Sequence, residues 1–189
     1  MKKKSLFIVF CILSLYIKIN AQSGAVVSVG LTTGYTDNPI VNHTNGFQSG
    51  WHASLSARFA DGNWYLRPGL ELHKVLLEAS NLIEPFADRP SVYLLKIPTQ
   101  IGYKVLNTKF FDIHLQAGLQ TTYTLKIQEN AYGYNHDKIR DFQFGALFGA
   151  AVDLGPLVLS MSYERAFTEM FTDTGFKADY FIYGIGFYF

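Results

Sequence analysis

The sequence predicts an all-β protein, an eight-stranded antiparallel up-and-down transmembrane β-barrel. Three observations indicate this fold class. Apolar and polar residues alternate along eight separate segments, which is the pattern of strands with one apolar and one polar face. The connections between these segments are short and long in turn, as in an antiparallel meander. Aromatic residues gather near the segment ends on the apolar side, which favours a membrane-embedded barrel.

The first 21 residues are expected to form a removable signal peptide, followed by one barrel domain at 22–189. Three lysines at positions 2–4 precede an apolar run at 6–17, and the small residue Ala21 offers a cleavage point. The run is too short for an ordinary transmembrane helix, which needs roughly 20 residues. The only cysteine, Cys11, lies in this run, so the mature domain is expected to contain neither a disulfide nor a reactive thiol.

The charge balance argues against a nucleic-acid partner. Four of the 16 Lys and Arg residues lie in the expected signal peptide, and none of the 15 Asp and Glu residues does. The mature chain therefore carries 12 basic and 15 acidic residues, a net charge of −3. Nucleic-acid-binding domains present a basic patch, and this composition offers none.

The first four expected strands each show the two-residue period. In 24–36, valine, leucine and tyrosine alternate with serine, glycine and threonine. In 51–59, tryptophan, alanine, leucine and phenylalanine alternate with histidine, serine and arginine. In 64–76, tryptophan and leucine lie opposite tyrosine, arginine, glutamate and histidine. In 92–105, tyrosine, leucine and isoleucine lie opposite lysine and glutamine.

The last four expected strands continue this pattern. The longest, FDIHLQAGLQTTYTLKIQ at 111–128, places phenylalanine, isoleucine and leucine on one parity, and histidine, glutamine, threonine and Lys126 on the other. In 142–153, phenylalanine and valine alternate with glutamine, glycine and aspartate. In 157–164, leucine, methionine and tyrosine alternate with serine and glutamate, and 180–189 presents an aromatic apolar face.

The connections predict a closed sheet with one tight end. Short turns rich in glycine, asparagine, aspartate and proline lie at 60–63, 106–110 and 154–156. The long, mixed connections lie at 37–46, about 77–90, about 129–140 and about 167–179. This arrangement places both chain termini at the short-turn end, and an even number of antiparallel strands can close into a barrel.

The apolar face is expected to contact lipid, and the polar face to fill a narrow interior. The polar parity is rich in glycine and short side chains, which fit the small lumen of eight strands. Several segments have 12 to 18 residues, enough for the roughly 9–11 that cross a bilayer. The chain ends on Phe189 in an aromatic strand, as bacterial outer-membrane barrels characteristically do. The alternative is a soluble periplasmic lipocalin-like barrel, whose two faces are reversed around a ligand cavity.

Two strand motifs resemble the PorT-like outer-membrane β-barrel family. They are YLRPGLELHK at 65–74 and YLLKIPTQIGYKV at 93–105, where members often read aromatic-Leu-x-Pro-Gly-Leu and Tyr-Leu-x-Ile-Pro. FGALFGAAVDL at 144–154 and YGIGFYF at 183–189 are similar to the last strands of that family. The resemblance covers the mature chain. It implies a barrel in the cell outer membrane, reached by export through the periplasm, and assistance to protein secretion is a role within the family.

Eight ionisable side chains on the polar parity are expected to form a structural network inside the barrel. They are Arg58, Arg67, Glu71, Lys96, Lys104, Asp112, His114 and Glu164. Charges enclosed in a narrow barrel are costly unless they are paired, so their mutual pairing would plug the lumen. The alternative is a network that gates ions or performs acid–base chemistry. The expected partners across the three short turns are His52 and Glu71, Lys104 and Asp112, and Leu147 and Glu164.

An enzymatic alternative rests on His52, Ser54 and Glu71, which lie near one another on the polar parity. Some eight-stranded outer-membrane barrels are lipid A acylhydrolases or acyltransferases, and a nucleophile, a base and an acid must lie within hydrogen-bond reach. These side chains would point into a sealed lumen, so we expect no catalytic residue. The lumenal histidines His52, His73 and His114 lack close spacing, so we expect no metal and no cofactor.

The expected function is that of a non-enzymatic outer-membrane barrel, structural or partner-binding through its long extracellular loops, with a role in secretion or envelope organisation. The connections at 37–46, 78–90 and 131–141 all carry asparagine, and the last also carries tyrosine; both residue types suit a binding surface on a rigid scaffold. The expected partners are outer-membrane lipid and a protein bound by these loops. A barrel enzyme that modifies outer-membrane lipid is the alternative, beside the soluble ligand-binding barrel.

Overall fold

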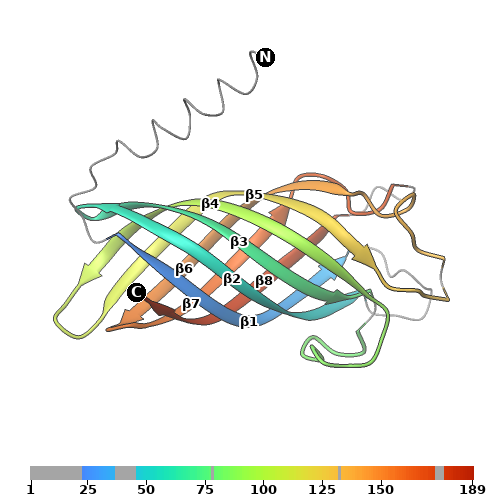
Figure 1. Ribbon diagram of the computed structural model, residues 1–189, viewed down its shortest axis with the longest axis horizontal. Helices are drawn as coiled ribbons and strands as arrows, with labels where there is room; N and C mark the ends of the chain where they lie inside the picture. The colour runs from blue at the N-terminus through green and yellow to red at the C-terminus, as the bar shows by residue number, and fades with distance from the viewer. Residues whose placement is uncertain (1–22, 37–45, 78, 132, 173–176) are drawn as a thin grey trace, which may run out of the picture.

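The chain forms a closed barrel of eight antiparallel strands that follow one another in sequence order (Figure 1). The computed structural model describes residues 23–36, 46–77, 79–131, 133–172 and 177–189. The strands are β1 (Gly24–Thr36), β2 (Phe47–Asp61), β3 (Trp64–Leu76), β4 (Ser91–Asn107), β5 (Asp112–Ile127), β6 (Phe142–Leu154), β7 (Leu157–Ala166) and β8 (Ala178–Tyr188). β1 also pairs with β8, which closes the sheet. The predicted fold class is confirmed.

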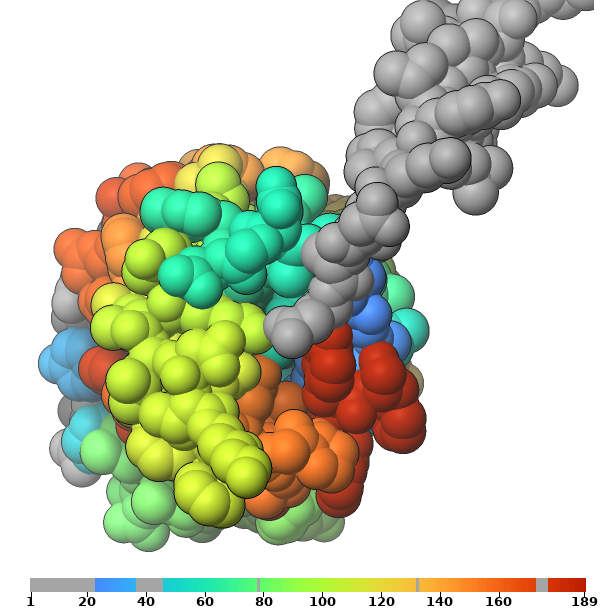
Figure 2. Space-filling view, turned by 90° about the vertical axis from the view of Figure 1, so that its left-hand side faces the viewer, coloured from blue at the N-terminus to red at the C-terminus, as the bar shows by residue number. Residues whose placement is uncertain are grey.

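The two ends of the barrel differ, and we name them by their connections. The short-turn end holds the β2–β3, β4–β5 and β6–β7 turns, and it lies on the left in Figure 1. The long-loop end, on the right, holds the other connections. Gly62 and Gly155 take positive φ angles of 60° and 62° in two of the turns, a conformation that glycine adopts without steric cost. Figure 2 shows the short-turn end, where the β4–β5 turn (yellow-green) lies beside the β6–β7 turn (orange) and β8 (red).

The barrel wall is apolar outside and polar inside. Leu115 is 56% exposed, whereas its neighbour Gln116 is 4% exposed. The same contrast recurs along the other strands, since the exposed large hydrophobic side chains include Val29, Leu55, Leu70, Ile97, Leu119, Phe148 and Ile185. A soluble barrel would bury that parity instead. The structure therefore excludes the reversed, lipocalin-like arrangement.

The strict alternation fails near the end of β5. Tyr93 pairs with Lys126 while Leu94 pairs with Thr124, so Leu125 is an extra, bulged residue. As a result Lys126 is exposed, whereas Ile127 packs against buried apolar side chains in the interior. The two-residue period predicted the opposite placement of these two side chains. A β-bulge inserts one residue and reverses every side chain that follows it.

Two of the three predicted strand registers were wrong by two residues. His52 pairs with His73 and not with Glu71, and Lys104 pairs with His114 and not with Asp112. The β2–β3 hairpin is tighter than expected, because its last paired residues are Asp61 and Trp64. A slip of two keeps each side chain on its predicted face. The third register, which pairs Leu147 with Glu164, is confirmed.

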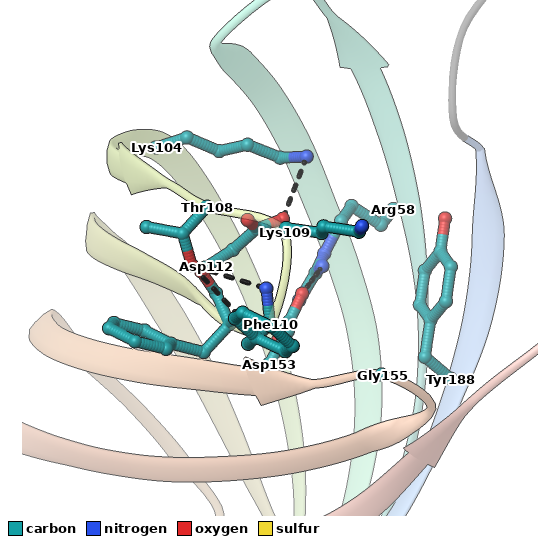
Figure 3. Close-up of a pocket in the computed structure, with 10 residues that line it drawn as sticks. Arg58, Lys104, Thr108, Lys109, Phe110, Asp112, Asp153, Gly155 and Tyr188 are labelled. Atoms are coloured by element: carbon teal, nitrogen blue, oxygen red, sulfur yellow. Dashed lines mark hydrogen bonds and ion pairs between the residues drawn. The ribbon is translucent and has the colours of Figure 1, made fainter.

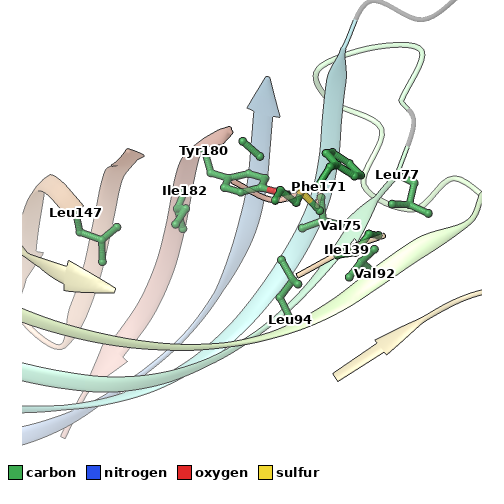
Figure 4. Close-up of a cluster of buried hydrophobic side chains, with 11 residues drawn as sticks. Val75, Leu77, Val92, Leu94, Ile139, Leu147, Phe171, Tyr180 and Ile182 are labelled. Carbon is green, nitrogen blue, oxygen red and sulfur yellow. Dashed lines mark hydrogen bonds between the residues drawn. The ribbon is translucent and has the colours of Figure 1, made fainter. Parts of the chain in front are cut away.

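The interior near the long-loop end is apolar, which the sequence analysis did not predict. We call this group the inner apolar cluster (Figure 4); it consists of Val75, Leu77, Val92, Leu94, Ile139, Leu147, Met170, Phe171, Ala178, Tyr180 and Ile182. Four of these residues, Leu77, Ile139, Met170 and Phe171, come from connections and not from strands. Ile139, before β6, and Phe171, before β8, form an isolated antiparallel bridge. Two long connections therefore fold inward and pack on the lumenal side of the wall.

Some expectations concern residues outside the described part of the chain. The expected signal peptide at 1–21 and nearly all of the connection at 37–46 belong to this group. Among the described residues, no helix has both the length and the apolar character that crossing a membrane requires.

Candidate functional site: the polar lumen and its short-turn mouth

The structure places all eight predicted network residues in the barrel interior. Six of them are buried: Arg58, Arg67, Lys96, Lys104, His114 and Glu164. Glu71 and Asp112 are half-buried. Inward and outward side chains alternate along these parts of the strands. The inward side chains there have even residue numbers on β2, β4, β5 and β7 and odd numbers on β3, and all eight predicted residues fit this rule. Six of these residues form two groups at different depths, whereas Arg67 and Glu71 have other partners.

The first group lies at the mouth of the short-turn end and is centred on Asp153 of β6. Arg58 donates two hydrogen bonds to this carboxylate, with Nη1–Oδ2 and Nη2–Oδ1 distances of 2.5 and 3.4 Å. His114 Nε2 lies 3.0 Å from Asp153 Oδ2. On the other side of the mouth, Lys104 Nζ lies 3.4 Å from Asp112 Oδ2. Bidentate arginine–carboxylate pairs hold a fixed geometry as well as neutralising charge.

Two tyrosine rings enclose the Arg58 guanidinium. Its Cζ lies 4.9 Å from the ring centroid of Tyr65 and 5.1 Å from that of Tyr188, within the range of cation–π attraction. The Tyr65 hydroxyl accepts a hydrogen bond from Gln116 Nε2 at 2.9 Å. A Cβ atom at Gly102 would overlap the Tyr65 ring, so the close approach of this ring requires glycine.

Arg67 connects the mouth to the middle of the barrel through neutral partners. Its Nε donates to Ser56 Oγ at 3.0 Å, and its Nη1 donates to Gln116 Oε1 at 3.1 Å. Because Gln116 also donates to the Tyr65 hydroxyl, one amide of β5 contacts an arginine and a tyrosine that lie two residues apart on β3. Satisfied polar networks of this kind stiffen an interior.

The second group lies deeper, beside the inner apolar cluster. Lys96 of β4 and Glu164 of β7 form an ion pair of 2.5 Å across the lumen, and the Lys96 ammonium lies 4.3 Å from the Tyr180 ring centroid. Glu71 does not join this pair: its Oε2 lies 2.8 Å from His73 Nε2. The sequence analysis predicted neither the Lys96–Glu164 pair nor the contact between Glu71 and His73.

The sequence analysis did not include several lumenal residues in the predicted network. Asp153, Tyr65, Tyr188 and Gln116 all lie on the lumenal parity of expected strands, which was the available signal. Parity indicates a face but neither the depth along the barrel nor the strand opposite. Arg58 and Asp153 are 95 positions apart, so their contact depends on barrel closure.

The mouth group forms one side of a pocket of about 330 Å³ that opens at the short-turn end (Figure 3). The pocket is lined by Arg58, Lys104, Thr108, Lys109, Phe110, Phe111, Asp112, Asp153, Gly155 and Tyr188. Figure 3 shows the carboxylates of Asp112 and Asp153 facing the basic side chains above them. Charges of both signs line this pocket, where Arg58 is paired with Asp153 and Lys104 with Asp112.

Three of the mouth residues have the donor atoms of a metal site. Asp112, His114 and Asp153 place one ligand atom each within 4.8 Å of one another. The two carboxylates, however, already face Arg58 and Lys104. A divalent cation would lie beside these two positive charges, so the arrangement favours structural ion pairing.

The residues of the enzymatic alternative do not assemble. Ser54 Oγ lies 2.6 Å from Ser28 Oγ, and the His52 ring stacks on His73 with centroids 4.9 Å apart. Glu71 contacts His73 instead of His52. A cavity of about 20 Å³ borders these side chains, which is room for about one water molecule. Acyl transfer needs a nucleophile bonded to its base, and the described contacts provide no such pair.

Comparison with known proteins supports the architecture. A family model described as outer membrane protein beta-barrel domain matches residues 20–172. The fold is similar to Neisserial surface protein A, with a TM-score of 0.54 and 14% identity, covering 89% of this chain and 100% of that chain. No curated protein gives a significant match.

Two further outer-membrane structures are similar at lower scores. Ail, the attachment invasion locus protein of Yersinia pestis, has a TM-score of 0.48 and 11% identity, covering 89% of this chain and 100% of that chain. OprG from Pseudomonas aeruginosa has a TM-score of 0.48 and 13% identity, covering 88% and 96%. The family match spans most of the chain, and the closed eight-stranded wall with its apolar exterior agrees with it. This chain therefore belongs to the outer membrane protein beta-barrel domain family and is an outer-membrane protein.

Proposed function

We propose that the protein is a non-enzymatic outer-membrane barrel that binds a protein partner at the cell surface through the β3–β4 connection, residues 77–90. The observation that carries this proposal is an apolar patch on that connection. Ile83 is 71% exposed, Phe86 is 80% exposed and Leu82 is 47% exposed. We call these three residues the loop patch. Exposed apolar groups that lie together mark interaction sites more often than scattered ones do.

The loop patch is presented on a fixed base. The Leu77 amide donates to the Pro90 carbonyl at 2.9 Å, which closes the connection at its root. Further along, the Ala79 amide donates to the Phe47 carbonyl at 3.1 Å, and the Glu84 amide donates to Ser49 Oγ at 2.7 Å. These bonds hold the connection against the start of β2. A preorganised loop loses less conformational entropy on binding than a free one.

The proposed topology places the loop patch outside the cell. Outer-membrane barrels have short periplasmic turns and longer extracellular loops, so the short-turn end would face the periplasm. The PorT-like strand motifs at 65–74 and 93–105 support a place in that branch of the family. Assistance to protein secretion or to envelope organisation is the role we propose for the complex.

The proposal of a non-enzymatic role rests on the lumen. Most of its ionisable side chains form ion pairs or hydrogen bonds with one another, and Ser54 contacts Ser28 and not a base. We expect overexpression to leave the membrane lipid composition unchanged. A change that Ser54→Ala abolishes would favour the lipid-modifying enzyme instead.

Photo-crosslinking in living cells tests the loop patch. A benzophenone amino acid replaces Ile83 in one strain and Phe110 in another. Phe110 is 81% exposed in the β4–β5 turn and serves as the control at the opposite end. We expect a discrete protein adduct at position 83 that disappears when Phe86→Ser is added, and no such adduct at position 110.

A lipid adduct at position 83, or an adduct that Phe86→Ser leaves intact, would contradict the proposal. A deletion strain supplies the functional readout. Wild-type protein should restore secretion and envelope integrity, whereas the Ile83→Ser/Phe86→Ser variant should not, although it reaches the outer membrane in equal amount.

A further inference from the structure

We infer that the outer wall near the long-loop end carries a binding site for an anionic, phosphate-bearing lipid of the outer leaflet, formed by Lys74 and Lys126 on either side of Tyr93. This inference does not depend on the loop patch, which lies on a connection and not on the wall. It rests on the distribution, the register and the pairing of the charged side chains that face lipid.

Charged side chains on the outer wall are distributed unevenly. Among the described strand residues, the basic side chains on the outward parity are Lys74, Lys126 and Arg165. Each lies within two residues of the point where its strand meets the long-loop end. The opposite end of the wall carries no basic side chain on the described strands. Such a bias places positive charge at one interface of the bilayer only.

Lys74 and Lys126 lie in one lateral row across three neighbouring strands. Tyr93 of β4 pairs with Lys74 on β3 and with Lys126 on β5. Two strand spacings separate the lysines, which is about 10 Å. Trp51 of β2 pairs with Lys74 and extends the row by one aromatic residue. Aromatic and basic side chains alternate along this row, as they do where a wall meets lipid head groups.

The bulge at Leu125 is what brings Lys126 into the row. With unbroken alternation Lys126 would face the lumen and Ile127 would face lipid. The bulge reverses them, and Ile127 packs against the inner apolar cluster. Bulges commonly redirect a side chain in this way. The outward lysine is thus a consequence of a specific irregularity in the sheet.

Neither lysine of the row has an acidic partner within the described part of the chain. The ion pairs found there involve other basic side chains. Arg165 offers a comparison, because its Nη1 lies 2.5 Å from Asp179 Oδ2 on the neighbouring strand. The protein neutralises one outward cation and leaves two uncompensated. A cation at the edge of the hydrocarbon layer is stabilised by an anion from the lipid head groups.

The occupant that fits is a lipid and not a soluble anion. Below the row the wall presents Leu72 and Ile97, which are 36% and 47% exposed and would contact acyl chains. Lysines near the interface extend their ammonium groups toward the head groups while their methylene stems stay on apolar surface. Phosphate at that level would bridge Lys74 and Lys126 around the Tyr93 ring.

Fluorescence quenching by brominated lipid tests this site, because the chain has only two tryptophans. The Trp64→Phe variant leaves Trp51 beside Lys74. The Trp51→Phe variant leaves Trp64 at the short-turn end as the control. Each protein is reconstituted in phosphatidylcholine vesicles that contain increasing fractions of brominated phosphatidylglycerol or of brominated phosphatidylcholine. Preferential quenching by the anionic lipid measures its enrichment beside each tryptophan.

We expect Trp51 to show a preference for the anionic lipid that falls by about 5-fold for each lysine replaced by glutamine and by about 30-fold for Lys74→Gln/Lys126→Gln. Trp64 should show none. The variant Lys109→Gln/Lys138→Gln, which loses the same charge elsewhere, should retain the preference. The inference would be overturned if Trp51 showed the same preference for the anionic lipid with both lysines present and in the Lys74→Gln/Lys126→Gln variant. The inference would also be overturned if inorganic phosphate abolished the preference of Trp51 for the anionic lipid while chloride of equal ionic strength did not. The site would then bind a soluble anion.

Discussion

Lys96 and Glu164 form an ion pair across the barrel, with Nζ and Oε2 2.5 Å apart. The two residues come from β4 and β7, which are not neighbours in the sheet. Their side chains are 0% and 7% exposed, and the pair lies beside the inner apolar cluster, whose Leu147 is the register partner of Glu164. This pair therefore connects opposite walls of the barrel where the polar lumen meets the apolar part of the interior.

Removing one member of this pair should destabilise the barrel strongly. Lys96→Met leaves the Glu164 carboxylate enclosed without a partner, at a cost of about 3–5 kcal/mol in the free energy of unfolding. Lys96→Met/Glu164→Leu should regain most of that loss, because the double variant encloses no charge. Urea titrations in detergent, followed by tryptophan fluorescence, compare the three proteins. If Lys96→Met were as stable as the wild type, the pair would not be structural.

A charge on the outer wall should cost more in the middle of a strand than at its end. Leu119 lies in the middle of β5 and is 50% exposed, whereas Leu154 ends β6 at a turn and is 42% exposed. In lipid vesicles Leu119→Arg should lower stability by about 2–4 kcal/mol and Leu154→Arg by no more than about 1 kcal/mol. Equal losses at the two positions would contradict a lipid-facing wall.

Gly102 should tolerate no side chain while the Tyr65 ring packs over it. Gly102→Ala should cost about 1–3 kcal/mol of unfolding free energy, because the new Cβ overlaps a ring that is 3% exposed. In a Tyr65→Leu background the same alanine should cost less, and a double-mutant cycle measures the difference. Additive effects would show that ring and glycine do not contact each other.

The inward-folded connections should contribute to stability. Ile139 is fully buried in the inner apolar cluster although it lies outside the strands. Ile139→Ala should lower the free energy of unfolding by about 2–5 kcal/mol and expose the β5–β6 connection to protease. Phe110→Ala, at a position 81% exposed in a turn, should change stability by less than about 0.5 kcal/mol. A protease-resistant Ile139→Ala protein would argue against this packing.

The strands and their faces could be predicted from the sequence because a two-residue period is a direct consequence of strand geometry. An apolar residue followed by a polar one predicts that Leu115 faces outward and Gln116 faces the lumen, as the structure shows. Lys126 and Ile127 could not be predicted in the same way, since the bulge at Leu125 depends on how β4 and β5 pair. A local pattern carries no information about an irregularity created by a neighbouring strand.

Parity placed the lumenal residues on the correct face, and the expected contact between Lys104 and Asp112 is present, but the partners across the barrel were not predicted. Arg58 meets Asp153 only after the sheet closes, and Lys96 meets Glu164 across strands that never pair. The inner apolar cluster was missed for a related reason. Val75 and Leu94 lie on the polar parity of their strands, and only the folded connections that carry Ile139 and Phe171 make them part of a core.

The most direct test of a lipid-embedded closed barrel is the electrophoretic mobility of the protein from the outer-membrane fraction, with and without boiling. A closed barrel resists detergent until it is heated, so the unboiled protein should migrate faster than the boiled protein and should occur in that fraction alone. A protein that purifies without detergent and shows the same mobility in both samples would contradict the account.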